Sequence, residues 1–244
     1  MKNRKIKIFS NQEKLAKYFS EILIKKISKN TSNYNLSIAL AGGSTPKKIF
    51  KYMADNYSGK INWEKTNFFF GDERCVPPND AESNFKMVDD ILFSPLQIPT
   101  NNIFRVKGEN DPANEAKNYS NVIKKNVRLK KEVPRFDIVM LGIGEDGHTA
   151  SIFPNQIELF HSKNICEVAT HPESGQKRIS LTGTVISNAK LIVFIATGKN
   201  KSKIVSELLN ENKDKSNNYP ASLVSSKKGK LVWLLDTESA SLLY

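Results

Sequence analysis

Only two cysteines, Cys75 and Cys166, occur among the 244 residues. Two cysteines are too few for a disulfide framework, and they form no metal-ligand cluster in the sequence. No run of 18 or more apolar residues is present, so we expect no membrane-spanning helix and no membrane partner. The basic N-terminus has no apolar stretch leading to a cleavage site, which argues against a signal peptide. These absences predict a protein of the reducing cytoplasm.

Arginine is also scarce. The chain carries a formal net charge of +12, yet only six of its 37 basic residues are arginines, and the lysines are scattered. Proteins that read nucleic acids usually rely on arginine for bidentate contacts, so we expect no nucleic-acid partner. The positive field would still attract an anionic substrate.

Several catalytic motifs are missing. The sequence contains no G-x-S-x-G nucleophile elbow, no H-E-x-x-H zinc motif and no cysteine beside a plausible base. It also lacks the G-x-G-x-x-G and P-loop spacings, which argues against a dinucleotide or ATP site. The chemistry is therefore expected to use water or a proton shift rather than a covalent intermediate.

Strand and helix patterns alternate along the whole chain. Because most of the expected strands are continuous apolar runs, they predict a sheet buried on both faces. We predict an α/β fold: a Rossmann-like three-layer αβα sandwich with a mostly parallel sheet, formed by a single domain over residues 1–244. The expected strands are Lys5–Phe9, Leu36–Ala41, Asn67–Phe70, Phe136–Leu141, Lys177–Leu181, Leu191–Ala196 and Leu231–Leu235.

Helices are expected between these strands. Ser10 and Glu13 have capping-box spacing and predict a helix through about Ile27. Further helices are expected after Gly43, from about Ser83, over Asp111–Lys130, over Lys199–Leu209 and briefly after the last strand. The stretch Asn210–Asn218 is expected to be a surface loop.

Ligands of open α/β sheets bind at the carboxyl ends of the strands. Gly43, Ser44 and Thr45 lie there, where glycine, hydroxyl groups and a helix N-terminus favour an anion, although a simple capped turn has the same residue types. Asp72 and Arg74 follow the next strand and could line a pocket rim or form a solvated loop.

His148 is the strongest candidate catalytic residue, because it follows a buried strand and three glycines. A histidine can act as general base, and a nearby carboxylate can orient its ring. Asp146 is close enough in sequence for that role, but spacing alone leaves the contact open. Arg178 and Lys201 are two further cations that could enclose a phosphate, although each alone could be a surface charge.

These segments together resemble the 6-phosphogluconolactonase family, part of a superfamily shared with glucosamine-6-phosphate deaminase. The resemblance runs in order from about Leu36 to Asp236 through LAGGSTP, FFFGDERCVPPNDAESNF, DIVMLGIGEDGHTASIFP, RISLTGTVISNAKLIVFIATGKNKSKIV and LVWLLD. DGHTASIFP is similar to the lactonase branch, whereas deaminases resemble DGHIAFNEP.

The resemblance implies a Rossmann-like fold, no metal or organic cofactor, and hydrolysis of 6-phospho-D-glucono-1,5-lactone in the oxidative pentose phosphate pathway. It implies that Gly43, Ser44 and Thr45 bind the phosphate, that Arg178 and Lys201 neutralise it, and that Asp72 and Arg74 line the sugar site. His148 would be catalytic, with Asp146 beside it.

The expected partner is thus a small phosphorylated sugar lactone, and the expected state is a monomer or weak dimer. Two other functions stay open. One is a glucosamine-6-phosphate deaminase/isomerase, and the other is a non-catalytic sugar-phosphate sensor.

Overall fold

A six-stranded sheet in the order β1-β11-β10-β7-β2-β3 forms the centre of the protein, and every neighbouring pair is parallel. The computed structural model describes residues 4–210, 218–226 and 229–243. The strands are β1 (Arg4–Phe9), β2 (Leu36–Leu40), β3 (Thr66–Phe70), β7 (Ile138–Leu141), β10 (Leu191–Ala196) and β11 (Lys230–Asp236). The predicted parallel α/β sheet is confirmed.

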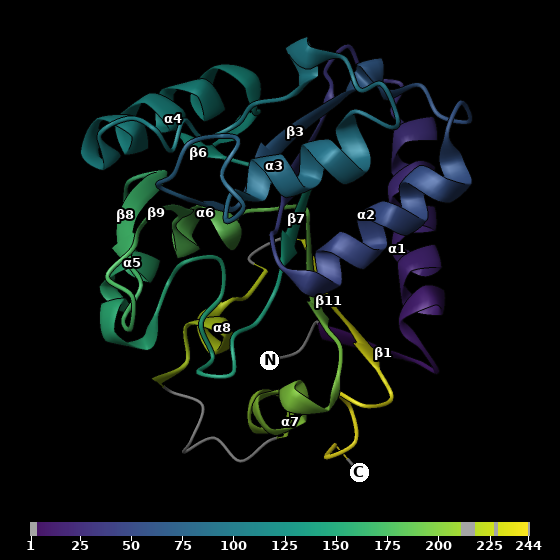
Figure 1. Cartoon of the computed structure of the whole chain (residues 1–244), viewed down its shortest axis with the longest axis vertical. Helices are drawn as coiled ribbons and strands as arrows, with labels where there is room; N and C mark the ends of the chain where they lie inside the picture. The colour runs from purple at the N-terminus through teal and green to yellow at the C-terminus, as the bar shows by residue number, and fades with distance from the viewer. Residues whose placement is uncertain (1–3, 211–217, 227–228, 244) are drawn as a thin grey trace.

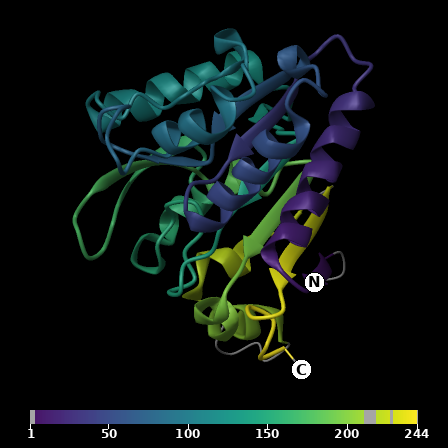
Figure 2. The same cartoon turned by 45° about the vertical axis from the view of Figure 1, so that its right-hand side comes forward.

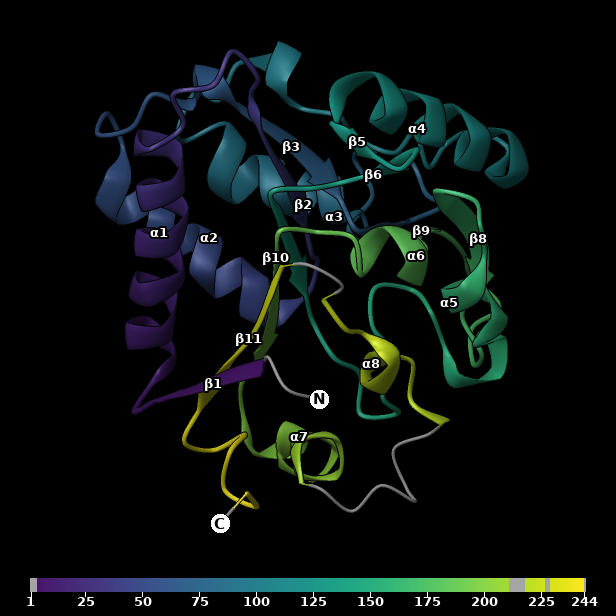
Figure 3. The same cartoon turned by 180° about the vertical axis from the view of Figure 1, so that it is seen from behind.

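Helices cover both faces of this sheet, with α1 and α2 on one side and α4 and α6 on the other (Figures 1 and 3). They are α1 (Gln12–Ser28), α2 (Ser44–Tyr57), α3 (Asn84–Val88), α4 (Pro112–Asn126), α5 (Glu158–His161), α6 (Gly183–Ile186), α7 (Ser202–Leu209) and α8 (Pro220–Leu223). The three layers of the predicted sandwich are therefore present.

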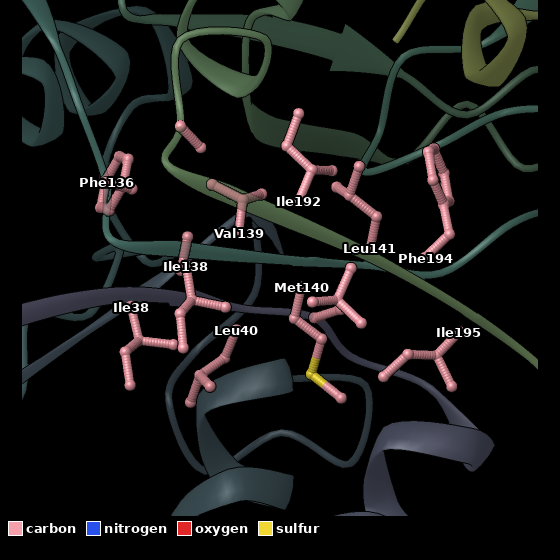
Figure 4. Packing of buried hydrophobic residues seen from close by; sticks show 14 of the residues in the cluster. Ile38, Leu40, Phe136, Ile138, Val139, Met140, Leu141, Ile192, Phe194 and Ile195 are labelled. Carbon is pink, nitrogen blue, oxygen red and sulfur yellow. The ribbon is translucent and has the colours of Figure 1, made fainter. Parts of the chain in front are cut away.

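The central strand β7 explains why the apolar runs are continuous. Figure 4 shows Ile138 and Met140 pointing to the side of the sheet opposite to Val139 and Leu141. All four side chains are buried, because successive residues of a strand face opposite layers and both layers are covered here.

A second sheet, antiparallel and in the order β4-β9-β8, was not expected. It consists of β4 (Asp72–Arg74), β8 (Cys166–Thr170) and β9 (Lys177–Leu181). The GDER segment is thus a strand rather than a loop, because Gly71 O accepts a hydrogen bond from Leu181 N at 2.8 Å and the chain then pairs with β9. Two short strands, β5 (Leu129–Lys130) and β6 (Val133–Pro134), form a separate hairpin.

Some local predictions were wrong. Asn11, rather than Ser10, caps α1, since its side chain accepts a hydrogen bond from Lys14 N at 2.9 Å. The helix predicted to extend to Lys130 ends at Asn126, and hydrogen-bonded turns replace the short helix expected after β11. Most of the predicted loop Asn210–Asn218 lies outside the described residues.

Candidate active site

A cavity of about 220 Å³ lies at the carboxyl ends of β2, β3, β7 and β10. Eight of the nine predicted site residues line it: Gly43, Ser44, Thr45, Asp72, Arg74, His148, Arg178 and Lys201. The ninth, Asp146, does not line the cavity but contacts His148. The placement follows the carboxyl-end rule for parallel sheets, which brings residues distant in sequence to one edge.

His148 and Asp146 form a hydrogen-bonded pair, with 2.6 Å between Nδ1 of the ring and Oδ1 of the carboxylate. Burial raises the pKa of Asp146, but the hydrogen bond and positive charge of His148 outweigh it, and the net shift is downward. The carboxylate is therefore ionised and accepts the Nδ1 proton. That tautomer leaves Nε2 as the basic nitrogen, and Nε2 has no hydrogen-bond partner among the described residues.

Gly144 makes this pair possible. A Cβ atom at Gly144 would lie 2.1 Å from His148 Nδ1 and 2.3 Å from Asp146 Oδ1. The loop folds back on itself here, since Gly144 N donates to His148 O at 2.9 Å and Gly147 N donates to Gly144 O at 3.1 Å. The fully buried ring of Phe153 packs against the His148 ring, with 4.8 Å between the ring centroids.

The segment Gly43–Thr45 forms the N-terminus of α2. Gly43 is the N-cap with φ of 102°, a conformation that favours glycine, and no side chain caps the first turn. The free N–H groups and the positive end of the helix dipole therefore face the cavity, where they can hold an anion. Thr45 Oγ1 is fixed by a 2.8 Å hydrogen bond with Thr197 Oγ1 from the loop after β10.

Arg74 and Arg178 are direct neighbours in the β4–β9 pairing. Burial and then the charge of Arg74 lower the pKa of Arg178. Neither guanidinium forms an ion pair with a carboxylate among the described residues. Arg178 lies over the Phe153 ring at 5.6 Å from its centroid. Two adjacent cations without a carboxylate partner are suited to an anionic ligand.

Lys201 also lines the cavity, from the segment between β10 and α7. It ends the 3-10 turn Lys199–Lys201 and is the N-cap of α7, so it precedes the helix rather than lying in its first turn. Gly198, with φ of 91°, starts this turn, and its N–H donates to both carboxylate oxygens of Asp236 at 3.0 and 3.1 Å. The end of β11 thereby fixes the loop that carries Lys201.

Sequence reasoning missed the groups that hold Asp72 and Arg74 in place. Glu73 is buried, and its carboxylate accepts hydrogen bonds from the backbone N–H groups of Arg74, Asn84 and Phe85 at 2.7 to 2.8 Å. Burial raises the pKa of Glu73, while the three N–H groups oppose that shift. Asn84 donates to Asp72 O at 3.0 Å, and the only sequence signal for it was the ESNF segment of the family resemblance.

Ser151 is a further missed residue. Its Oγ donates to Asp72 Oδ2 at 2.7 Å, and its N–H donates to Ser180 Oγ at 3.1 Å. Ala150 has φ of 49°, and this tight turn between Thr149 and Ile152 aims Ser151 at the second sheet. The loop that carries His148 is thus tied directly to the strand that carries Asp72.

The family resemblance implies that Asp72 lines the sugar site, so Ser151→Ala is expected to raise KM about tenfold with a smaller change in kcat. The reason is that Asp72 loses a hydrogen bond worth about 1.5–3 kcal/mol for a charged acceptor. Steady-state kinetics with the phosphorylated lactone that the resemblance implies would measure this. Ser174→Ala, on an exposed turn, is the control. An unchanged KM in Ser151→Ala would show that Asp72 does not need this partner.

The family model for glucosamine-6-phosphate isomerases/6-phosphogluconolactonase matches residues 10–233. This match spans nearly all of the chain and includes every residue of the cavity described above. The chain belongs to this family.

Its sequence relatives point to one branch of the family. A 6-phosphogluconolactonase from Treponema pallidum is 46% identical over 176 residues, covering 72% of this chain and 73% of the relative. A 6-phosphogluconolactonase from Haemophilus influenzae is 42% identical over 214 residues, covering 86% and 89%. These similarities support 6-phosphogluconolactonase activity.

Solved structures agree with the fold. The 6-phosphogluconolactonase from Trypanosoma brucei superposes with a TM-score of 0.87 at 29% identity, covering 99% of both chains. A monomeric glucosamine-6-phosphate deaminase superposes with a TM-score of 0.80 at 21% identity, covering 98% of this chain and 99% of the deaminase. At that identity the second match shows the fold alone.

Among the described residues, no helix is long and apolar enough to cross a membrane.

Proposed function

We propose that this protein hydrolyses 6-phospho-D-glucono-1,5-lactone to 6-phospho-D-gluconate, with His148 as the general base, as a step of the oxidative pentose phosphate pathway. The observation that carries the proposal is the His148–Asp146 pair beside a cavity whose other walls present the α2 N-terminus, Lys201 and two arginines. Such a cavity matches a substrate with one phosphate and one ester carbon.

The lactone carbonyl is already electrophilic, so the enzyme needs to position it and activate water. His148 Nε2 takes a proton from the attacking water, and Asp146 stabilises the imidazolium that results. The imidazolium then gives the proton to the ring oxygen as the C1–O bond breaks. A positioned acid/base of this kind contributes about 10²–10⁴-fold to the rate.

The oxyanion formed at C1 requires a hydrogen-bond donor. The N–H groups of Gly144 and Gly147 are already used inside the histidine loop. This favours Arg74 as the donor, whose Nη1 is held by a 2.7 Å hydrogen bond to Glu82 O. In this proposal the substrate phosphate lies between Gly43–Thr45 and Lys201. Binding the phosphate there holds the lactone in the position needed for attack.

A rapid lactonase assay at mildly acidic pH tests the proposed reaction, because spontaneous hydrolysis is slower there and would not mask the enzyme. We expect fast hydrolysis of the phosphorylated lactone. Release of ammonia from glucosamine 6-phosphate without lactone hydrolysis would instead identify a deaminase. Absence of both activities would favour a sensor.

Lys201→Ala is expected to raise KM for the phosphorylated lactone about 10- to 100-fold, because a charged hydrogen bond to phosphate contributes about 1.5–3 kcal/mol. The rate with unphosphorylated gluconolactone should hardly change, since that substrate has no group for Lys201 to bind. Comparing kcat/KM for the two lactones measures the effect. If native enzyme hydrolysed both equally well, the phosphate-site assignment would be wrong.

A further inference from the structure

A second concave surface, the basic groove, lies away from the active site. Its volume is about 950 Å³, and eight of its fifteen lining residues are basic while none is acidic. The basic residues are Lys5, Lys7, Lys25, Lys26, Lys29, Arg135, Lys190 and Lys230. The chain as a whole has 25 acidic residues, so their absence from this lining distinguishes the groove from the average surface.

The groove is formed between the C-terminal half of α1 and the amino ends of the parallel strands. Lys230 begins β11, Lys190 directly precedes β10, and Leu36 begins β2. Figure 2 shows α1 (purple) lying beside β11 (yellow), and the two elements are in contact. The active-site cavity opens at the carboxyl ends of β2, β3, β7 and β10, so the groove and the cavity lie at opposite ends of β2 and β10.

Of the seven lysines in the basic groove, only Lys190 forms an ion pair with a carboxylate among the described residues. Asp137 pairs with Lys190 at 2.6 Å, and its other oxygen accepts hydrogen bonds from Ser37 N and Oγ at 3.0 and 3.2 Å. Burial lowers the pKa of Lys26, Asp137 partly opposes this, and the charges of Lys190 and Lys230 lower it further. The amine of Lys26 is therefore partly desolvated and faces two other cations.

We propose that the basic groove binds a small anion that carries several phosphate groups. Lysine amines have a positive charge, three donors and no acceptor, so an acceptor-rich anion both accepts their hydrogen bonds and reduces their mutual repulsion. Several phosphates are needed because the lysines come from separate elements: β1, α1, the residue before β10 and the first residue of β11. The volume lies within the range for small-molecule pockets, which favours a compact ligand over a polymer.

The test uses inorganic tripolyphosphate as the probe, with binding to the full chain measured by calorimetry at low salt. The native protein should bind it both without and with saturating 6-phosphogluconate. Lys26→Gln/Lys230→Gln should weaken binding about tenfold or more. The control Lys17→Gln/Lys125→Gln removes the same charge from exposed positions outside the groove and should retain at least half of the native affinity.

Thermal unfolding without the anion separates binding from folding. Removing Lys26 and Lys230 relieves repulsion, so Tm without tripolyphosphate should be unchanged or higher, while the increase caused by the anion should shrink. Four outcomes would overturn the proposal: no binding, competition by 6-phosphogluconate, equal weakening in both double variants, or tighter binding of a single-stranded oligonucleotide through the same lysines. Lactonase activity is not a readout, so failure here leaves the proposed function untouched.

Discussion

Replacing His148 with alanine is expected to lower kcat by about 10²–10⁴-fold while leaving the fold and the binding of 6-phosphogluconate intact. The variant removes the only imidazole that lines the cavity among the described residues, and with it the group that we propose accepts the proton of the attacking water. The residues proposed to bind the phosphate are untouched, so product affinity should persist. Single-turnover kinetics and calorimetric titration with 6-phosphogluconate measure the two parts separately.

The fold should survive because the lost contacts are partly exposed. The side chains of His148 and Asp146 are 28% and 43% exposed, and such pairs contribute about 1 kcal/mol or less. The lowered pKa of Asp146 adds stability above its unfolded pKa, and this is lost as the pH falls through the folded value. At neutral pH the variant should therefore unfold close to the native Tm, and the small loss should fade under acidic conditions.

His171→Ala is a matched control. The His171 ring also packs against Phe153, at 5.2 Å between centroids, but it does not line the cavity. Its replacement should leave kcat within about twofold of native, since it removes a similar ring contact and no proton acceptor. Near-native turnover in His148→Ala, or equal losses in both variants, would contradict the assignment of His148 as base.

The parallel sheet could be predicted because each strand carries its own evidence. The runs Leu36–Leu40 and Leu191–Ala196 are buried at every position, and all of their residues except Ser37 are apolar. The second sheet could not be predicted in the same way. Only two of the five residues of β8 are buried, and its pairing with β9 depends on contacts that periodicity does not encode.

The residues that line the candidate site could also be predicted from the strands. The carboxyl-end rule needs only strand positions, and these placed Gly43, Arg74 and Lys201 around one cavity correctly. The supporting residues depend on long-range contacts. Ser151 and Asp72 are 79 residues apart in sequence, and no local pattern predicts that their side chains meet.

The contact between Asp146 and His148 could be predicted only in part. Its spacing from His148 made the pair conceivable, but two residues in a glycine loop can point in many directions. The structure resolves the question through Gly144, whose missing side chain leaves room for both groups. Geometry rather than residue type therefore defines the proposed base, and this can be tested without removing any titratable group.

Gly144→Ala is expected to lower kcat about 100-fold, because the new Cβ would occupy the space of His148 Nδ1 and Asp146 Oδ1 and displace the ring by about 1 Å or more. Gly144 does not have a positive φ, so alanine meets no left-handed backbone strain there, and the three atoms nearest to the new Cβ belong to these two side chains. Product affinity and Tm should stay near native, and kcat should carry most of the loss.

The decisive measurement places Gly144→Ala in the His148→Ala background. If glycine matters only by making room for the histidine, the second substitution has nothing left to displace, and the double variant should be no slower than His148→Ala alone. Additive losses would mean that Gly144 acts independently, for example by letting the substrate approach the backbone. A non-additive result would show that the hydrolytic rate depends on the position of the His148 ring. The ring can take that position because Gly144 has no side chain.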